Sequence, residues 1–370
     1  MEEMRSGYTT GACAAAGTKA ALLYLQQAQL VSEVRLYSLK GETFIVPVKS
    51  VEKTKQGALA VIVKDAGDDP DITHGTLVIS EVEIDENSAE IHFFAGDGVG
   101  KMTKPGLSVP PGEPAINPGP RQMITEVVRE ILGQDKGCRV TISIPAGREL
   151  AKKTLNPVLG IEGGLSIIGT TGIVRPMSEE GFKNALTPQI SVAKAAGRSS
   201  IIFVPGKIGE KAAVEKYQLP VDAIVQTSNF LGHMLEFAVK EKIQRVLLFG
   251  HLGKLVKAAA GIFYTHNRIA DARMETLAAY AGAMGLPQEG IRQILEAAAT
   301  EAVIPILEEY GIGQEFYNKI AARASERAVR YVFNEMQIGT VLVTLTGEIL
   351  GMDKTAAEIG SDLGWNIRSL

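Results

Sequence analysis

The densest group of side chains that could do chemistry lies in residues 250–273. It contains two histidines, which can transfer protons, and several cations that can hold an anionic ligand. The group consists of His251, Lys254, Lys257, His266, Asn267, Arg268, Asp271 and Arg273. His251 and His266 are not one helical turn apart and no HExxH sequence occurs, so the spacing is not that of a zinc site. A lone histidine in such a segment is more often structural than catalytic.

A second group is acidic and lies in DAGDDPDITHG, residues 65–75. Its members are Asp65, Asp68, Asp69 and Asp71, followed by His74. The carboxylates could bind a hard cation, but the spacing is not that of an EF-hand, and Pro70 interrupts it. They could instead contact ribose hydroxyls or act as a base. An Asx-rich turn without chemistry is the third interpretation.

A glycine-rich segment, GDGVGKMTKPGL at residues 96–107, directly follows a predicted strand. Backbone N–H groups in a G-x-G-x-G turn can bind a phosphate or a carboxylate. The pattern is not a Rossmann fingerprint, because the third glycine comes one residue too early and Pro105 prevents a following helix. It is not a Walker A motif either, so taken alone it is a weak signal.

Residues 145–177 combine many glycines and prolines with apolar runs and closely spaced polar side chains. Linkers are usually polar throughout, so we expect this stretch to be ordered, with backbone N–H groups that face an anion. It connects two halves of different character, and ligands often bind where domains meet. We therefore expect the active site beside it. An ordered connector with buried turns is the alternative.

The elements that would position these groups differ between the two halves. In the first half we expect a helix that is capped by Thr9 or Thr10 and whose early residues are almost all small. Small residues allow close packing by another element, or the approach of a ligand to the helix N-terminus. Alternating and β-branched patterns then predict mostly antiparallel strands, with 75–85 and 90–95 as an antiparallel pair. Residues 1–150 are thus predicted to form an α+β domain.

The second half repeats strands and helices, which predicts an α/β domain over 151–370 with a largely parallel sheet, entered through the connector 145–177. The predicted strands are 200–204, 222–225, 245–250 and 339–346, and one helix is predicted over 178–197. In such sheets, ligands bind at the carboxyl ends of the strands. These ends include the segments 205–210, 226–235 and 250–273.

Composition limits the class of protein. The chain has 370 residues and a net charge of −4, with both signs interspersed and no basic run, so we expect no nucleic-acid partner. Its two cysteines do not make a disulfide framework. The first residues lack the apolar region of a signal peptide, and no apolar run is long enough to span a bilayer. We therefore expect a cytoplasmic protein with no membrane partner, and the sequence leaves both a monomer and a homo-oligomer open.

Seven blocks of the sequence resemble the cobalt-precorrin-5B (C1)-methyltransferases (CbiD) of anaerobic cobalamin biosynthesis. The blocks are GYTTGACAAAGTKAA (7–21), DAGDDPDITHG (65–75), GDGVGKMTKPGL (96–107), GEPAINPGPRQMI (112–124), IPAGRELAKKTLNPVLGIEGGLSIIGTTGIVRPMS (144–178), SNFLGHML (228–235) and GHLGKLVKAAAGIFYTHNRIADAR (250–273). They run in the family's order across nearly the whole chain. Because each block is long and not generic, the resemblance is highly specific.

The resemblance implies transfer of a methyl group from S-adenosylmethionine to C-1 of cobalt-precorrin-5B, giving cobalt-precorrin-6A. It also implies a first domain similar to ribosomal protein S5 domain 2. Cobalt would enter as part of the substrate, and we expect no metal bound by the protein itself, since no ligand set has suitable spacing. The protein would have to align the methyl donor with a ring carbon and exclude water.

Site roles follow from this chemistry and not from catalytic residues known in the family. We expect a base, where one is needed, to come from His251, His266 or Asp68. The residues expected to bind the methyl donor are Gly96, Asp97, Gly98, Gly100, Thr170, Thr171 and Asp271. Those expected to bind the acetate and propionate arms of the ring are Thr9, Thr10, Lys104, Arg121, Lys153, Arg175, Lys254 and Lys257.

Two other functions stay open at this point. S5-like domains and glycine-rich loops also occur in small-molecule kinases, although 96–107 lacks a recognisable Mg²⁺-binding partner motif. A corrinoid carrier without chemistry is the other alternative, although no histidine motif of that class is visible. Titration with S-adenosylmethionine and with ATP would distinguish the three functions.

Overall fold

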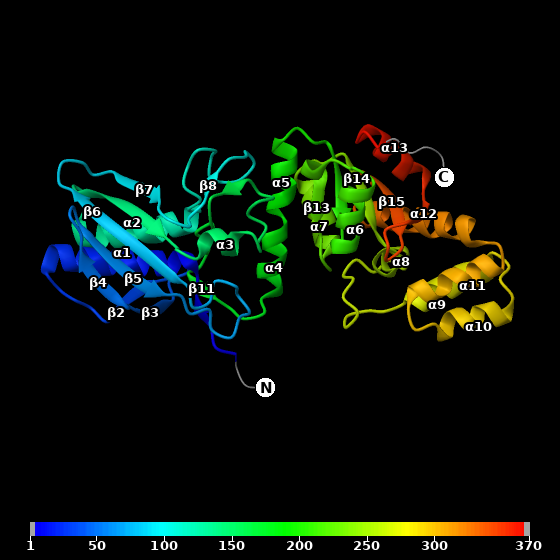
Figure 1. Ribbon diagram of the computed structural model, residues 1–370, viewed down its shortest axis with the longest axis horizontal. Helices are drawn as coiled ribbons and strands as arrows, with labels where there is room; N and C mark the ends of the chain where they lie inside the picture. Colours follow the sequence, from blue (N-terminus) through cyan, green and yellow to red (C-terminus); the bar gives the residue numbers. More distant parts are fainter. Residues whose placement is uncertain (1–3, 366–370) are drawn as a thin grey trace. The chain divides into compact units, whose positions relative to one another are not determined.

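The computed structural model describes residues 4–365 and divides the chain into two compact units, Met1–Glu179 and Glu180–Leu370 (Figure 1). The division comes later than the predicted boundary at residue 150. Two short strands explain the difference, because each pairs with an earlier strand of the first unit. Strand β10 (Ile161–Glu162) pairs with β8 (Lys101–Met102), and β11 (Ile173–Val174) pairs with β1 (Gly7–Tyr8). Most of the connector thus belongs to the first unit.

The first unit contains a five-stranded sheet in the order β4-β5-β6-β9-β7. Its strands are β4 (Ser50–Lys53), β5 (Ala58–Val63), β6 (Leu77–Asp85), β7 (Ile91–Ala95) and β9 (Gly137–Ser143). All pairs are antiparallel except β7 with β9, which confirms the antiparallel character that the sequence predicts. The predicted pairing of β6 with β7 is wrong. Strand β9 lies between them and pairs with both.

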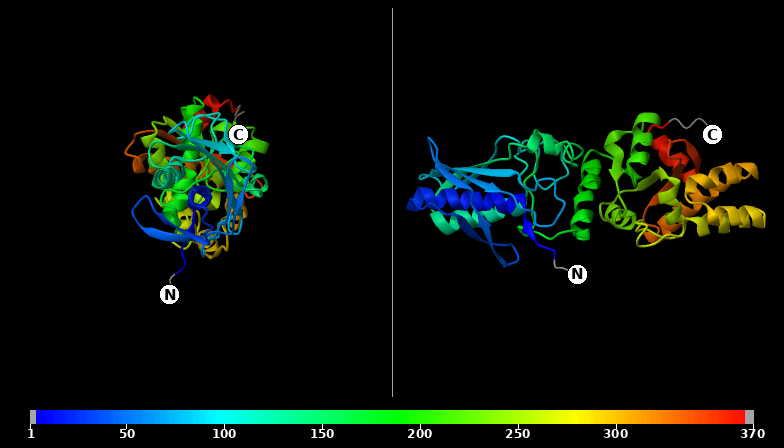
Figure 2. Two further views of the ribbon diagram at one scale, coloured as in Figure 1. Left: turned by 90° about the vertical axis from the view of Figure 1, so that its left-hand side faces the viewer. Right: turned by 60° about the horizontal axis from the view of Figure 1, so that its bottom comes forward.

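Helix α1 (Thr10–Gln27) packs along one face of this sheet and against α2 (Pro118–Leu132) (Figure 2). Its small residues allow close packing, because a Cβ at Gly17 would lie 2.7 Å from Oγ of Ser80 on β6. A separate hairpin, β2 (Glu33–Tyr37) with β3 (Thr43–Pro47), and the short helix α3 (Gly147–Ala151) complete the unit's regular structure. Helix α2 begins at Pro118, since proline is well suited to the first helical position.

The second unit contains the sheet β13-β12-β14-β15-β16. Its strands are β12 (Ser200–Val204), β13 (Ile224–Gln226), β14 (Arg245–His251), β15 (Gln337–Val343) and β16 (Ile349–Met352). The first four are parallel and β16 is antiparallel, which confirms the largely parallel sheet. The chain passes from β12 to β13 on one side and then to β14 on the other. The carboxyl ends of β12 and β14 therefore flank the point where strand order reverses, a usual place for ligands.

Helices surround this sheet. The predicted helix over 178–197 is two helices, α4 (Glu179–Leu186) and α5 (Pro188–Ala195), because Pro188 starts a new helix. The others are α6 (Lys207–Lys211), α7 (Leu231–Lys240), α8 (Leu252–Ala259), α9 (Arg273–Ala283), α10 (Gln288–Glu296), α11 (Val303–Glu309), α12 (Gly313–Tyr331) and α13 (Lys354–Asp362), with short turns η1 (Ala212–Lys216), η2 (Val221–Ala223) and η3 (Thr300–Ala302). Within residues 4–365, no helix has the length and apolarity to cross a membrane.

Candidate functional site

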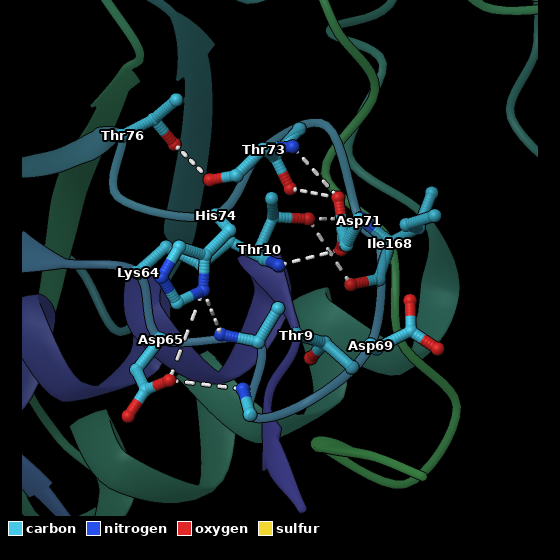
Figure 3. A network of polar contacts seen from close by, with 12 residues as sticks. Thr9, Thr10, Lys64, Asp65, Asp69, Asp71, Thr73, His74, Thr76 and Ile168 are labelled. Atoms are coloured by element: carbon cyan, nitrogen blue, oxygen red, sulfur yellow. Dashed lines mark hydrogen bonds and ion pairs between the residues drawn. The ribbon is translucent and has the colours of Figure 1, made fainter. Parts of the chain in front are cut away.

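The acidic loop 65–75 wraps around the N-terminus of α1 and is held by a network of polar contacts (Figure 3). Lys64 is almost fully buried, and its Nζ lies 2.6 Å from Oδ2 of Asp71. The backbone N–H and the hydroxyl of Thr73 both donate to Oδ1 of Asp71. Burial acts to raise the pKa of Asp71, but hydrogen bonds from Lys64 and Thr73 outweigh it and lower this pKa. Asp71 is therefore a fixed carboxylate that organises the loop.

The other three aspartates of the loop also accept protein donors. Arg5 donates to both carboxylate oxygens of Asp65, at 2.5 and 2.9 Å, and this contact is the main reason why the pKa of Asp65 falls to about 2. The backbone N–H of Arg5 donates to Oδ2 of Asp68, and that of Met177 to Oδ2 of Asp69. Among residues 4–365, no cluster of three His, Cys, Asp or Glu side chains could hold a metal ion. The hydrogen bonds of the loop are those of an ordered, Asx-rich turn. The role of Asp68 as a general base remains a prediction.

The N-terminus of α1 is covered by residues 168–172 of the same unit. Oγ1 of Thr9 accepts from the N–H of Ala12, and the hydroxyl of Thr10 exchanges hydrogen bonds with the backbone of Ile168. The N–H of Gly11 donates to the carbonyl of Ile168. These contacts favour close packing over ligand binding at this helix end. They also occupy the threonine hydroxyls that we expected to bind the ring.

The glycine-rich loop 96–107 is likewise bonded to its own unit. The N–H of Gly96 donates to the carbonyl of Ile142, and that of Gly100 to the carbonyl of Leu165. A Cβ at Gly147 would lie only 2.0 Å from the carbonyl oxygen of Gly98. The glycines are thus required for close backbone approach, which weakens their predicted role as donors to an anionic ligand.

Several of the remaining residues that are predicted to bind the methyl donor already contact other groups of the protein. Asp97 accepts from Arg148 at 3.0 Å, and both side chains are exposed. Thr171 exchanges hydrogen bonds with the backbone of Ile173, two residues on, while Thr170 is exposed. Asp271 belongs to the second unit. Their predicted contacts with the methyl donor remain predictions.

A groove of about 440 Å³ lies beside the edge strand β7. Arg121, which is predicted to bind the substrate, is one of the residues that line it. Its guanidinium donates to the carbonyl of Ile116 at 2.8 Å and lies 5.3 Å from the ring centroid of Phe93. Lys101 and Glu113 also line the groove. No sequence pattern marks Lys101 or Phe93, because their proximity to Arg121 depends on sheet pairing. This groove offers a cation and an apolar ring surface to a ligand of the first unit.

The other basic residues predicted for the first unit lie apart from this groove. Lys104 donates to the carbonyl of Val158 at 3.2 Å, and Arg175 lies 3.4 Å from a carboxylate oxygen of Glu42. Lys153 is exposed. None of the three lines the groove beside β7. Their predicted contacts with the ring arms remain predictions.

In the second unit, His251 ends β14 and caps α8. Its Nδ1 accepts from the N–H of Gly253, and its Nε2 lies 2.9 Å from Oε1 of Glu301, which also accepts from the N–H of Leu345. Because Nδ1 accepts from an amide, Nε2 is the ring nitrogen that can donate to Glu301. Both ring nitrogens are engaged by the protein. This geometry indicates that His251 ties three segments together and argues against the predicted role as a base.

Lys257 and Lys254 differ sharply, although both were predicted to bind the ring. Lys257 is fully buried, and its ammonium donates to the carbonyls of Thr265 and Ala270 and to Oδ1 of Asn267. With three donors and three acceptors, the Lys257 ammonium holds the loop 265–270, which disfavours a contact with the ring, and its predicted substrate-binding role remains a prediction. Lys254 is half-buried, and within residues 4–365 it bonds only to Oδ1 of Asn229. Burial is the main factor that lowers the pKa of both lysines.

Two further candidates lie on or after this loop. Nδ1 of the exposed His266 accepts from the N–H of Arg268 at 3.1 Å. Asp271 forms a two-bond ion pair with Arg273, and the hydrogen bond from Arg273 is the main cause of its lowered pKa. His266 and Asp271 therefore lie in or directly after the loop 265–270, which the Lys257 ammonium holds.

Two residues that the sequence analysis did not assign a role prove important here. Glu301, the partner of His251, lies in η3, where no motif marks it. Asn229, the partner of Lys254, lies in the segment 226–235 at the carboxyl end of a strand. This position could have marked Asn229 in the sequence as a candidate ligand-binding residue. Both contacts join segments far apart in the chain, so spacing alone could not reveal them.

Comparisons with known proteins give one consistent result. The family model described as CbiD matches residues 1–176, and that described as CbiD, C-terminal domain, matches residues 264–354. The chain is 50% identical to the cobalt-precorrin-5B C(1)-methyltransferase of Moorella thermoacetica, over 99% of this chain and 100% of the relative. It is 47% identical to the enzyme of that name from Methanocaldococcus jannaschii, over 95% and 96% of the two chains. A crystal structure titled as a cobalamin biosynthesis protein (cbiD) from Archaeoglobus fulgidus is 29% identical and covers 74% of this chain and 84% of its own, with a TM-score of 0.38.

Proposed function

This chain belongs to the CbiD family, and on that basis we propose that it is a cobalt-precorrin-5B C(1)-methyltransferase of cobalamin biosynthesis. The observation that carries the proposal is the match of half of all residues to a relative of that name over essentially both full lengths. We further propose that the methyl donor is S-adenosylmethionine, that the product is cobalt-precorrin-6A, and that the first unit has the fold of ribosomal protein S5 domain 2.

The residues present suit such reactants. S-adenosylmethionine would supply a methyl group already activated by the sulfonium, so the protein would need to align donor and ring carbon and to exclude water. Arg121 lines a groove whose apolar floor includes Phe93, and Lys254 keeps free donors in the second unit. These two cations are the best supported partners for carboxylate arms. Cobalt would arrive as part of the ring.

A kinase function is less well supported. Phosphate binding by 96–107 would need backbone N–H groups that point outward, whereas those of Gly96 and Gly100 donate to carbonyls of the same unit. A carrier without chemistry would bind the ring but would neither bind S-adenosylmethionine nor form a methylated product. Activity is therefore the decisive measurement.

The test is incubation with S-adenosylmethionine and cobalt-precorrin-5B under anaerobic conditions, followed by mass spectrometry and NMR of the product. We expect one additional methyl group, located at C-1, together with S-adenosylhomocysteine. A ring product of unchanged mass, obtained with folded protein, would overturn the proposal. Titration with ATP provides the comparison, and we expect no binding.

A further inference from the structure

Two lysine ammoniums without a carboxylate partner lie three residues apart on α8. Lys257 is fully buried and Lys254 half-buried, yet within residues 4–365 neither forms an ion pair. The nearby carboxylate of Asp271 forms an ion pair with Arg273, so its charge is shared between Arg273 and Lys257. Proteins rarely keep a lysine charge away from water without compensation. This part of the second unit therefore carries an excess of positive charge.

The two charges are compensated to different degrees. Lys257 donates to three oxygen atoms, so local dipoles surround its charge. Lys254 has one acceptor, Oδ1 of Asn229, and an ammonium has three donors. Two donors of Lys254 therefore remain for a ligand. The two lysines also repel each other, which further disfavours charge on Lys254 unless an anion is present.

Independent evidence comes from two threonines in the same segments. Thr227 and Thr265 are fully buried, and within the described part of the chain neither hydroxyl oxygen has a hydrogen-bond partner. Thr227 lies two residues before Asn229, and the N–H of Thr265 donates to the carbonyl of Asn229. Buried hydroxyls without partners are uncommon in native proteins. They indicate that these segments receive a polar group that the chain itself does not supply.

An apolar surface lies beside these polar groups. The rings of Phe230 and Tyr264 are 5.2 Å apart, and Nζ of Lys183 lies 5.4 and 5.9 Å from their two centroids. Both aromatic residues directly adjoin the segments that carry Asn229 and Thr265. A ligand that combines an anionic group with a flat or apolar body would match this arrangement.

We propose that Lys254 and Asn229, with the segments 226–230 and 263–267, form a binding site for a carboxylate group of a substrate. The proposal rests on the proposed function, in which both reactants carry carboxylates: the amino-acid part of S-adenosylmethionine and the acetate and propionate arms of the ring. Lys257 acts as a positioning residue, because it holds Thr265 and the loop that follows it.

The experiment is titration calorimetry of the full chain with three probes. S-adenosylhomocysteine carries the amino-acid carboxylate, 5′-methylthioadenosine lacks it, and uroporphyrin is a tetrapyrrole with acetate and propionate arms. The variants are Lys254→Met, which keeps the apolar stem, and Lys254→Arg, which keeps the charge. Lys319→Met, at an exposed position on α12, is the matched control. Circular dichroism checks that each variant is folded.

We expect Lys254→Met to raise the Kd of one carboxylate probe about tenfold or more, with smaller effects of Lys254→Arg and none of Lys319→Met. Weaker binding of S-adenosylhomocysteine with unchanged 5′-methylthioadenosine identifies the amino-acid carboxylate. Weaker binding of uroporphyrin alone identifies a ring arm. Unchanged affinity of folded Lys254→Met for both carboxylate probes would overturn the site and leave the proposed function intact. Wild-type protein that binds neither probe and transfers no methyl group would overturn both.

Discussion

The Nζ of Lys64 lies 2.6 Å from Oδ2 of Asp71, although the Lys64 side chain is only 1% exposed. This ion pair joins the end of β5 to the acidic loop that surrounds the N-terminus of α1 (Figure 3). A buried charge that loses its partner is costly, whereas a buried apolar side chain of similar shape is tolerated. The pair is therefore a sensitive point for the stability of the first unit.

Asp71→Asn should lower the free energy of unfolding by about 3–5 kcal/mol, because it leaves the Lys64 ammonium buried without a counter-charge. Lys64→Met should cost less, since the apolar stem stays in the core and Thr73 continues to donate to Asp71. Urea unfolding of both variants measures the difference. Equal losses would show that burial of the lysine charge does not dominate.

Acid should unfold the first unit partly through Asp65. Its folded-state pKa is lowered from 3.8 to about 2, chiefly by the hydrogen bond from Arg5. A lowered folded-state pKa stabilises the protein above the unfolded-state value, and this contribution disappears as the pH falls from about 4 to 2. Arg5→Met should flatten the stability profile in that window. If Arg5→Met and the control Lys319→Met lost stability equally between about pH 4 and about pH 2, Arg5 would not be the cause of the lowered pKa of Asp65.

Two glycines of the first unit should differ in their tolerance of a methyl group. Gly147→Ala would place a Cβ 2.0 Å from the carbonyl oxygen of Gly98, so we expect a loss of about 3 kcal/mol or more. Gly163 has φ of +85° but no atom within 4 Å of an added Cβ. Gly163→Ala should therefore cost only about 1 kcal/mol for its backbone conformation. Thermal unfolding of the two variants checks this order.

His251 should matter for stability more than for chemistry. His251→Ala removes the cap of α8, so we expect a loss of about 1 kcal/mol in unfolding free energy. His251→Asn should recover most of it, because asparagine is a good N-cap. Methyl transfer by both variants should stay within a few-fold of wild type. A fall in kcat of about 100-fold or more without loss of stability would restore the role as a base.

Lys257→Met should loosen the loop 265–270. The substitution leaves three oxygen acceptors without their donor, and we expect a loss of about 3 kcal/mol or more. Hydrogen exchange should quicken in this loop before it changes in β14. Exchange that remains as slow as in Lys319→Met would show that the ammonium is not what holds the loop.

The sequence alone determined the features that depend on local patterns. Alternating residues predicted the antiparallel character of the first sheet, and repeated strand–helix segments predicted the parallel sheet of the second unit. The cap of α1 was predicted to be Thr9 or Thr10, and the structure shows that it is Thr9. The long family blocks also identified the family. Local periodicity and capping are short-range properties, so each can be read from neighbouring residues.

Only the tertiary structure decided which groups meet. Strand β9 separates β6 from β7 because strand order depends on long-range pairing, which a hairpin pattern does not encode. The same holds for the partners of the candidate site: Lys257 is satisfied by a loop that follows it, while Lys254 keeps free donors near Asn229. The two lysines are of the same type and lie on the same helix, so the sequence could not rank them. Their different roles arise from burial and from acceptors that distant segments bring to them.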